Sequence, residues 1–382
     1  MSVTTPAGFE AAGVAAGLKS SGALDLALVV NRGPRRAAAA VFTSNRAQAN
    51  PIIWSRQVIA DGEVAAIVLN SGGANCFTGA QGFQTTHATA EAVAEQLDVS
   101  AGDVLVCSTG LIGEQLDRSA LLSGVAAAAG ALGPHGDDAA RAIMTTDSVP
   151  KTVVVEGPGY TIGGMAKGAG MLAPGLATML AVLTTDADLP AAELDRALRI
   201  ATRVSFDRLD SDGCMSTNDQ VTLMASGASG VSPELDAFAQ LLVDACVLLM
   251  LQLQADAEGA SHDIRIEVTG AVTEADAVEV ARSVARSNLF KAAMFGNDPN
   301  WGRVLAAIGT TSAQFDPYAV DVSFNDVRLC HAGAPDRSRD EVDLRDRAIT
   351  VHIELHAGSE QATIYTNDLT HDYVHENSAY AS

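Results

Sequence analysis

One threonine, Thr178, stands where a glycine-rich segment gives way to an apolar run. The residues from Lys167 to Ala177 are mostly small or flexible, and those from Met179 to Leu183 have the pattern of a strand buried on both faces. A strand that opens with threonine holds the hydroxyl rigidly at its end. The hydroxyl could serve there as a nucleophile, although β-branched threonine also begins many strands for packing reasons alone.

A threonine hydroxyl needs a base beside it, and the α-amino group of the same residue can be that base once the chain is cut before it. This amine titrates near about pH 8 and can therefore accept a proton at neutral pH. The small Ala177 and the glycines before it would let the Thr178 hydroxyl reach the Ala177 carbonyl. An N-to-O acyl shift and hydrolysis would then cut the chain at that bond. From spacing alone, self-cleavage between Ala177 and Thr178 is a hypothesis.

Three further segments carry groups suited to acyl transfer. Thr109 and Gly110 follow an apolar strand, so a hydroxyl and a backbone N–H could point into a cleft, although such a sequence is also an ordinary turn. Taken alone, Lys167 would be a solvated surface lysine and Glu258 a solvated acid at a helix end.

These segments and others closely resemble the ornithine acetyltransferases, also called glutamate N-acetyltransferases, and the resemblance runs essentially end to end. That family consists of self-cleaving enzymes with an N-terminal threonine nucleophile. The shared segments lie at residues 70–75, 108–113, 144–147, 165–180, 216–219, 256–259, 298–303 and 376–380.

The resemblance implies a role for each candidate residue. Thr178 is the expected nucleophile, and Thr109 with Gly110 the expected oxyanion hole. Lys167 suits the α-carboxylate of the substrate, and Glu258 suits the amino groups of ornithine. The remaining positions that match substrate contacts are Thr145, Asn377 and the terminal Ser382, where family members have serine or threonine.

The reaction implied is a ping-pong transfer of acetyl from N-acetylornithine to glutamate, through an acetyl-threonine, in arginine biosynthesis. No cofactor is expected, and the two chains are expected to form an α2β2 assembly. The motifs leave open whether acetyl-CoA is also a donor. Three alternatives remain: an aminopeptidase or amidase that passes the acyl group to water, a paralogue that uses another amine, and a non-catalytic protein that keeps the fold.

Composition restricts the function further. A net charge of −22 opposes binding to nucleic acid or to anionic membranes. Five cysteines without C-x-x-C spacing favour neither a disulfide scaffold nor a zinc knuckle, and the N-terminus lacks a secretory signal pattern, so a cytoplasmic location is expected. The longest apolar stretch, Leu241 to Leu253, is shorter than the roughly 20 residues of a membrane span and is expected to be a core helix.

Nucleotide and metal sites are not indicated. The segment Gly163 to Gly168 lacks the spacing of a phosphate-binding loop. His371 and His375 would share one face of a helix, but no third ligand accompanies them.

Apolar runs alternate with helical patterns, which predicts a mixed α/β fold. Expected strands include 24–30, 37–42, 65–69, 103–107 and 151–155, with a glycine-rich loop at 163–170. The resemblance implies a four-layer α-β-β-α core of the self-cleaving aminopeptidase type. Cleavage would give an α chain of residues 1–177 and a β chain of residues 178–382. Residues 178–280 would complete the core, and 281–382 would form a smaller C-terminal α/β domain whose tail returns to the active site.

Overall fold

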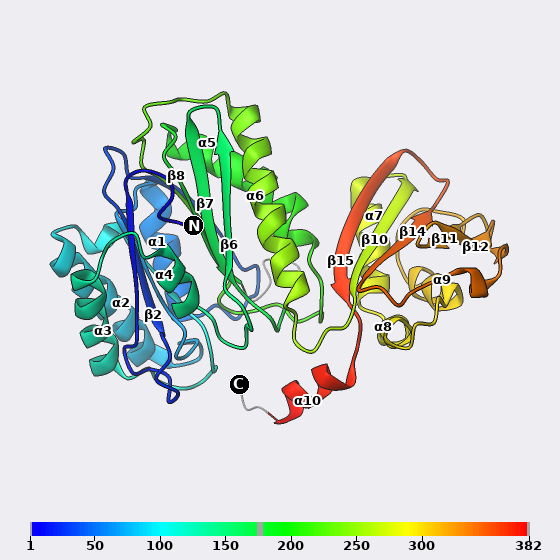
Figure 1. Cartoon of the computed structure of the whole chain (residues 1–382), viewed down its shortest axis with the longest axis horizontal. Coiled ribbons are helices and arrows are strands. Elements are labelled where there is room, and N and C mark those ends of the chain that lie inside the picture. The colour runs from blue at the N-terminus through cyan, green and yellow to red at the C-terminus, as the bar shows by residue number, and fades with distance from the viewer. Residues whose placement is uncertain (1, 174–178, 380–382) are drawn as a thin grey trace.

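The computed structural model describes residues 2–173 and 179–379. Two sheets lie face to face at its centre (Figure 1). The first has the order β1-β2-β4-β5, with bounds Phe9–Val14, Leu26–Asn31, Ala66–Asn70 and Val104–Ser108. The second has the order β3-β9-β8-β7-β6, with bounds Ala37–Phe42, Gln220–Ala225, Leu180–Thr185, Tyr160–Lys167 and Lys151–Gly157.

Helices cover the outer face of each sheet. Helices α2 (Gly79–Leu97) and α3 (Arg118–Gly130) share an apolar cluster with the first sheet, while α5 (Ala191–Val204) and α6 (Leu235–Ala255) share another with the second. A third cluster, with side chains of both sheets, fills the space between them. The expected α-β-β-α core is therefore confirmed. Shorter helices complete it: α1 (Asn50–Val58), α4 (Gly136–Ala142) and the 3-10 turns at Ile59–Asp61, Ala101–Asp103 and Phe206–Arg208.

The segment around Gly163 and Gly164 is not the loop expected from its glycines, because it lies inside strand β7. A Cβ atom on Gly163 would lie 2.3 Å from the carbonyl oxygen of Ser2, and one on Gly164 would lie 2.9 Å from the Leu183 side chain. Glycine is needed here because other parts of the chain pack directly against the strand. Lys167 consequently ends a buried strand and does not lie in a loop.

The C-terminal unit has its own six-stranded sheet and apolar core. Its order is β13-β12-β11-β14-β10-β15, with bounds Ala334–Pro335, Val327–His331, Asp321–Phe324, Ala348–Glu354, Asp263–Ala271 and Glu360–Asn367. Its helices are α7 (Glu274–Ala285), α8 (Asn288–Phe295) and α9 (Trp301–Ile308), with a 3-10 turn at Arg339–Glu341. Thr273 caps the start of α7, since its side chain accepts the N–H of Asp276 at 3.1 Å.

This unit begins earlier than the expected boundary at residue 281. Strand β10 lies between β14 and β15, and α7 packs on the same sheet. The change of sheet therefore falls in the connection between α6 and β10, at about residues 256–262. The last helix, α10 (His371–Ala379), leaves the unit and runs back toward the four-layer core (Figure 1).

Helix α6 is long and apolar enough to cross a membrane by length and composition. In this fold it packs against α5, β6 and β7. One face of the helix therefore belongs to the protein core, as predicted for a core helix.

Neighbouring leucines on α6 test this packing. Leu249 is fully buried, whereas Leu248 is 46% exposed. We expect Leu249→Ala to lower the free energy of unfolding by about 2–5 kcal/mol, because it removes buried methyl groups and leaves a cavity. The matched control Leu248→Ala should change it by about 0.5 kcal/mol. Urea denaturation followed by circular dichroism measures both, and equal losses would contradict this account of the core.

Candidate active site

The candidate residues gather where strands of the two sheets end. Asn70 and Ser108 lie opposite each other at the carboxyl ends of the parallel strands β4 and β5. Thr109, the next residue, donates its N–H to the Asn70 carbonyl at 3.0 Å. Lys167 ends β7 in the other sheet, and its Nζ donates to Thr109 Oγ1 at 3.2 Å. This contact joins the two sheet edges at one point.

Gly110 adopts a backbone conformation that few residues other than glycine tolerate. Its φ is +126°, and a Cβ atom there would lie 2.9 Å from the backbone nitrogen of Gly73. The close approach brings the segment after β4 against the turn after β5. Glycine is therefore required at position 110 for both conformation and space.

The connection before β9 holds the same region from the other sheet. Asn218 Nδ2 donates to the carbonyls of Ala74, at 2.7 Å, and Ser108, at 2.8 Å. Asp219 accepts the N–H of Met179 at 3.0 Å. Met179 directly follows Thr178, which lies outside the described residues, as do Ala177 and Ser382.

A cluster of buried charged side chains lies next to the end of β7, where Lys167 is. Lys151 is fully buried, and its Nζ contacts carboxylate oxygens of Asp147 and Asp256, each at 2.5 Å. Asp147 also accepts the N–H of Gly168 at 2.6 Å and that of Thr145 at 2.9 Å. One carboxylate thereby fixes the residue after Lys167 and the candidate Thr145.

Burial and charge pull the pKa values of this cluster in opposite directions. Burial alone would raise the pKa of Asp147, but the ammonium groups of Lys167 and Lys151 outweigh it and hold this pKa at about 2. Burial lowers the pKa of Lys167, with Asp147 acting against that shift. Burial also raises the pKa of Asp219 well above its usual range.

Glu258 is placed by the connection between the two units. Its N–H donates to the Ala169 carbonyl at 3.0 Å, which ties it to the segment after β7. Its carboxylate accepts a hydrogen bond from Asn377 Nδ2 of α10 at 2.9 Å. The structure thus brings together two expected substrate contacts that are far apart in the sequence.

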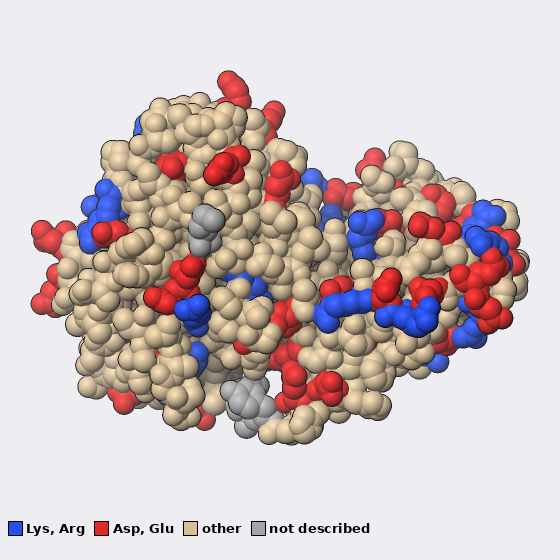
Figure 2. Space-filling model, in the orientation of Figure 1, with Lys and Arg blue, Asp and Glu red and all other residues tan. Residues whose placement is uncertain are grey.

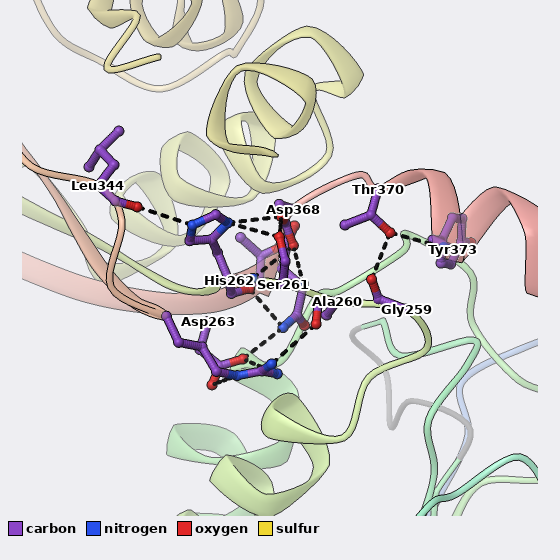
Figure 3. Close-up of polar contacts among 12 residues, drawn as sticks. Gly259, Ala260, Ser261, His262, Asp263, Leu344, Asp368, Thr370 and Tyr373 are labelled. Atoms are coloured by element: carbon purple, nitrogen blue, oxygen red, sulfur yellow. Dashed lines mark hydrogen bonds and ion pairs between the residues drawn. The ribbon is translucent and has the colours of Figure 1, made fainter. Parts of the chain in front are cut away.

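Asp368 fixes this connection against the start of the tail, as Figure 3 shows. Its carboxylate accepts the backbone N–H groups of Ser261 and His262, each at 3.0 Å, and contacts both of their side chains. Thr370 adds a bond to the Gly259 carbonyl at 2.6 Å. Gly259 and the tail lie so close that a Cβ on this glycine would be 2.3 Å from the nitrogen of Tyr373.

The contacts of Asp368 with Ser261 and His262, called here the Asp368 clamp, bring together a serine, a histidine and an aspartate. They do not form a hydrolase triad. His262 Nε2 lies 3.1 Å from the carbonyl oxygen of Leu344, which can only accept, so this nitrogen carries a hydrogen (Figure 3). Ser261 Oγ bonds to the same carboxylate as the imidazole. A catalytic histidine would need Nε2 free to take a proton from the serine. The arrangement is therefore a structural tie.

Sequence reasoning missed several residues of this site. Lys151 was expected only as the first residue of a strand, and Asp256 only as part of a shared segment. Their signal was the spacing of Asp147 and Lys151, four residues apart, but burial of such a pair is not visible in a sequence. Within residues 2–173 and 179–379, no group of three or more His, Cys, Asp or Glu side chains could hold a metal ion.

Comparisons with known proteins show the family of the chain. A model of the ArgJ family matches residues 10–382. The chain belongs to the ArgJ family. The arginine biosynthesis bifunctional protein ArgJ of Streptomyces coelicolor is 62% identical to it, and that of Thermobifida fusca 58%, each alignment covering 100% of both chains. Among solved structures, an ornithine acetyltransferase complexed with ornithine, from Mycobacterium tuberculosis, is 55% identical over 47% of this chain and 96% of that chain, with a TM-score of 0.45.

Membership in the ArgJ family confirms the family expected from the motifs. It also confirms the expected class of activity, an acyltransferase of arginine biosynthesis. On the face seen in Figure 2, acidic side chains are interspersed with the basic ones over the C-terminal unit. That face offers no broad basic surface of the kind that binds nucleic acid.

The low pKa of Asp147 predicts an acid-labile contribution to stability. A carboxyl whose pKa is lowered by folding stabilises the protein above its unfolded pKa of about 4, and this contribution is lost as the pH falls through the folded value. With a folded pKa of about 2, the loss falls between about pH 4 and pH 2 and amounts to about 2 kcal/mol.

We therefore expect wild type to lose about 2 kcal/mol more than Asp147→Asn over that interval, measured by urea unfolding at each pH. The exposed Asp138→Asn is the matched control and should follow wild type. Parallel pH profiles for wild type and Asp147→Asn would contradict the paired state of this carboxylate.

Proposed function

We propose that this ArgJ-family protein is a glutamate N-acetyltransferase that transfers the acetyl group of N2-acetyl-L-ornithine to L-glutamate. The observation that carries the proposal is the meeting of Lys167, Thr109 and the chain directly after Thr178 at one junction of the two sheets. Such a junction can supply a nucleophile, a hydroxyl donor and an ammonium group to one substrate.

The first half-reaction forms the acetyl-enzyme. Thr178 Oγ attacks the acetyl carbonyl, and its hydroxyl proton passes to the Thr178 α-amine. Thr109 Oγ1 and the Gly110 N–H donate to the developing oxyanion. The carbon–nitrogen bond then breaks, and the Thr178 ammonium returns the proton to the nitrogen of departing ornithine.

The second half-reaction reverses these steps with a new amine. The amino group of glutamate attacks the acetyl-threonine, its proton passes to the Thr178 amine, and the carbon–oxygen bond breaks. N-acetylglutamate leaves and the threonine hydroxyl is restored. Because both amines use the same centre in turn, the kinetics are ping-pong.

Substrate contacts follow from the charges at the site. Lys167 would bind the α-carboxylate, since it is the cation that bonds to Thr109. Glu258, held by Asn377, would bind an amino group of ornithine. Thr145 and the terminal Ser382 complete the proposed set.

Cleavage between Ala177 and Thr178 would leave chains of 177 and 205 residues. Strand β7 lies in the first and pairs along its length with β8 in the second, which supports a stable association of the two. An α2β2 assembly in the cytoplasm and the use of acetyl-CoA as a further donor are part of the same proposal. The relatives in Streptomyces coelicolor and Thermobifida fusca are called bifunctional proteins, which supports the second donor.

The intact mass of the purified protein tests the nucleophile directly. We expect two fragments that divide between Ala177 and Thr178 in wild type, and one uncut chain for Thr178→Ala, because only the hydroxyl can begin the acyl shift. After incubation with acetylornithine, the wild-type fragment that begins at Thr178 should gain the mass of one acetyl group. A full-length wild-type chain without acetylation would contradict the proposed nucleophile and favour the alternative of a non-catalytic protein that keeps the fold.

The proposed oxyanion hole predicts that the rate of acetyl-enzyme formation depends on a hydroxyl at position 109. Thr109→Val keeps the shape but loses the hydroxyl, and should lower the rate of acetyl-enzyme formation by about 100- to 1,000-fold. Thr109→Ser retains the donor and is the matched control. Rapid-quench mass spectrometry of the acetylated fragment gives both rates. If acetate is released in step with acetylornithine consumption without glutamate, the hydrolase alternative replaces transfer.

A further inference from the structure

A cavity of about 170 Å³ lies where the core, the C-terminal unit and the tail helix meet. Glu258 lines it from the connection after α6, Lys291 from α8, Asp368 from the position directly after β15, and Tyr373 from α10. Since Glu258 belongs to the proposed substrate site, the cavity adjoins that site and extends it toward the C-terminal unit. Lys291 has no part in the mechanism above.

Lys291 is a buried cation within this cavity. The residue is only 6% exposed, and its Nζ donates to the Ser211 carbonyl and, at 3.4 Å, to Thr366 Oγ1. An ammonium has three N–H donors, so one remains without a partner among the described residues. Burial lowers the pKa of Lys291 to about 8, so the group is still charged at neutral pH.

Asp212 is the nearest acidic influence on Lys291 in the cavity, and two further charged groups of the lining already have partners. Asp368 accepts the hydrogen bonds of the clamp at Ser261 and His262. Arg286 also lines the cavity, but its Nε donates to Asp210 at 2.8 Å. Lys291 is thus a buried cation of the cavity with a hydrogen still to donate, and Asp212, Glu258 and Asp368 contribute carboxylates to the same lining.

The proposed reaction demands such a pair. Ornithine and glutamate both react through the α-amino group, so the α-carboxylate of each occupies one position in its turn. Their side chains must then point the same way, although one ends in an ammonium and the other in a carboxylate. A single pocket binds both more strongly if it presents a group of each sign, because each side chain can then form a charge-assisted hydrogen bond.

We propose that Lys291 binds the side-chain carboxylate of glutamate and that Glu258 binds the side-chain ammonium of ornithine in this shared cavity. The proposal rests on the glutamate N-acetyltransferase activity proposed above. It assigns Lys291 to the selection of the acceptor, while acetyl-enzyme formation from acetylornithine proceeds without it.

Steady-state kinetics of Lys291→Gln test the assignment. The glutamine side chain can still donate to Ser211, but it has no charge. We expect kcat/KM for glutamate to fall by about 10- to 100-fold, as for loss of a charge-assisted hydrogen bond. Acetyl-enzyme formation from acetylornithine should be as fast as in wild type or faster, because the side-chain ammonium of ornithine then has no cation in its cavity. Lys291→Arg keeps the positive charge and should restore most of the acceptor reaction.

A neutral acceptor separates recognition from a merely structural role. Wild type should prefer glutamate to glutamine, and Lys291→Gln should lose this preference while the rate with glutamine stays the same. Equal losses for both acceptors, or an unchanged preference, would overturn the proposal. A wild-type protein that forms no acetyl-enzyme would instead show that the proposed function itself has failed.

A second variant, Glu258→Gln, tests the same assignment of charges if Lys291→Gln does not fold. Glu258→Gln should weaken the reaction with acetylornithine and spare, or improve, kcat/KM for glutamate, because Lys291 is then unopposed. Loss of both reactions to the same degree would overturn the assignment of opposite charges to the two substrates.

Discussion

The buried ion pairs of Lys151 with Asp147 and Asp256 are the constraint on which the site depends. Charges removed from water are tolerated only when they are paired and hydrogen-bonded, so the positions of these groups are tightly linked. Asp147 receives the N–H of Gly168, next to Lys167, and Asp256 lies two residues before Glu258. The cation and the carboxylate proposed for the substrate are therefore placed by a single cluster.

The sheet pairing explains why a cut before Thr178 is compatible with a stable fold. Lys167 lies opposite Leu180 in the β7–β8 ladder, and Leu180 lies beside Gln220 in β9. The strands on both sides of the proposed cut are thus buried partners in one sheet, and their side chains fill the core shared with the other sheet. The covalent bond between the fragments adds little to what holds them, because hydrogen bonds and apolar packing cross the same boundary.

Local pattern predicted much of this fold, and tertiary contacts explain the rest. Strand β3 has the predicted bounds Ala37–Phe42, and Thr273 caps α7 as its sequence indicates, because alternation and capping are local effects. Gly163 misled the prediction because its role is to let Ser2 approach, a contact 161 residues away in the chain. Lys151 was missed for the same reason: its partner Asp256 is 105 residues distant. The roles of Thr109 and Lys167 came from family resemblance and not from pattern.

A local balance of charge would let an acidic protein bind amino acids of both signs at the proposed site. The net charge of −22 resides mainly on exposed side chains, where solvent and salt screen it. Inside, each candidate cation has a carboxylate nearby, as for Lys167 with Asp147 and Lys291 with Asp212. Such balance avoids a strong field that would favour ornithine over glutamate. In the proposed site the C-terminal unit supplies the cation Lys291, and the contacts of Asp368 hold the connection that carries Glu258 against the tail.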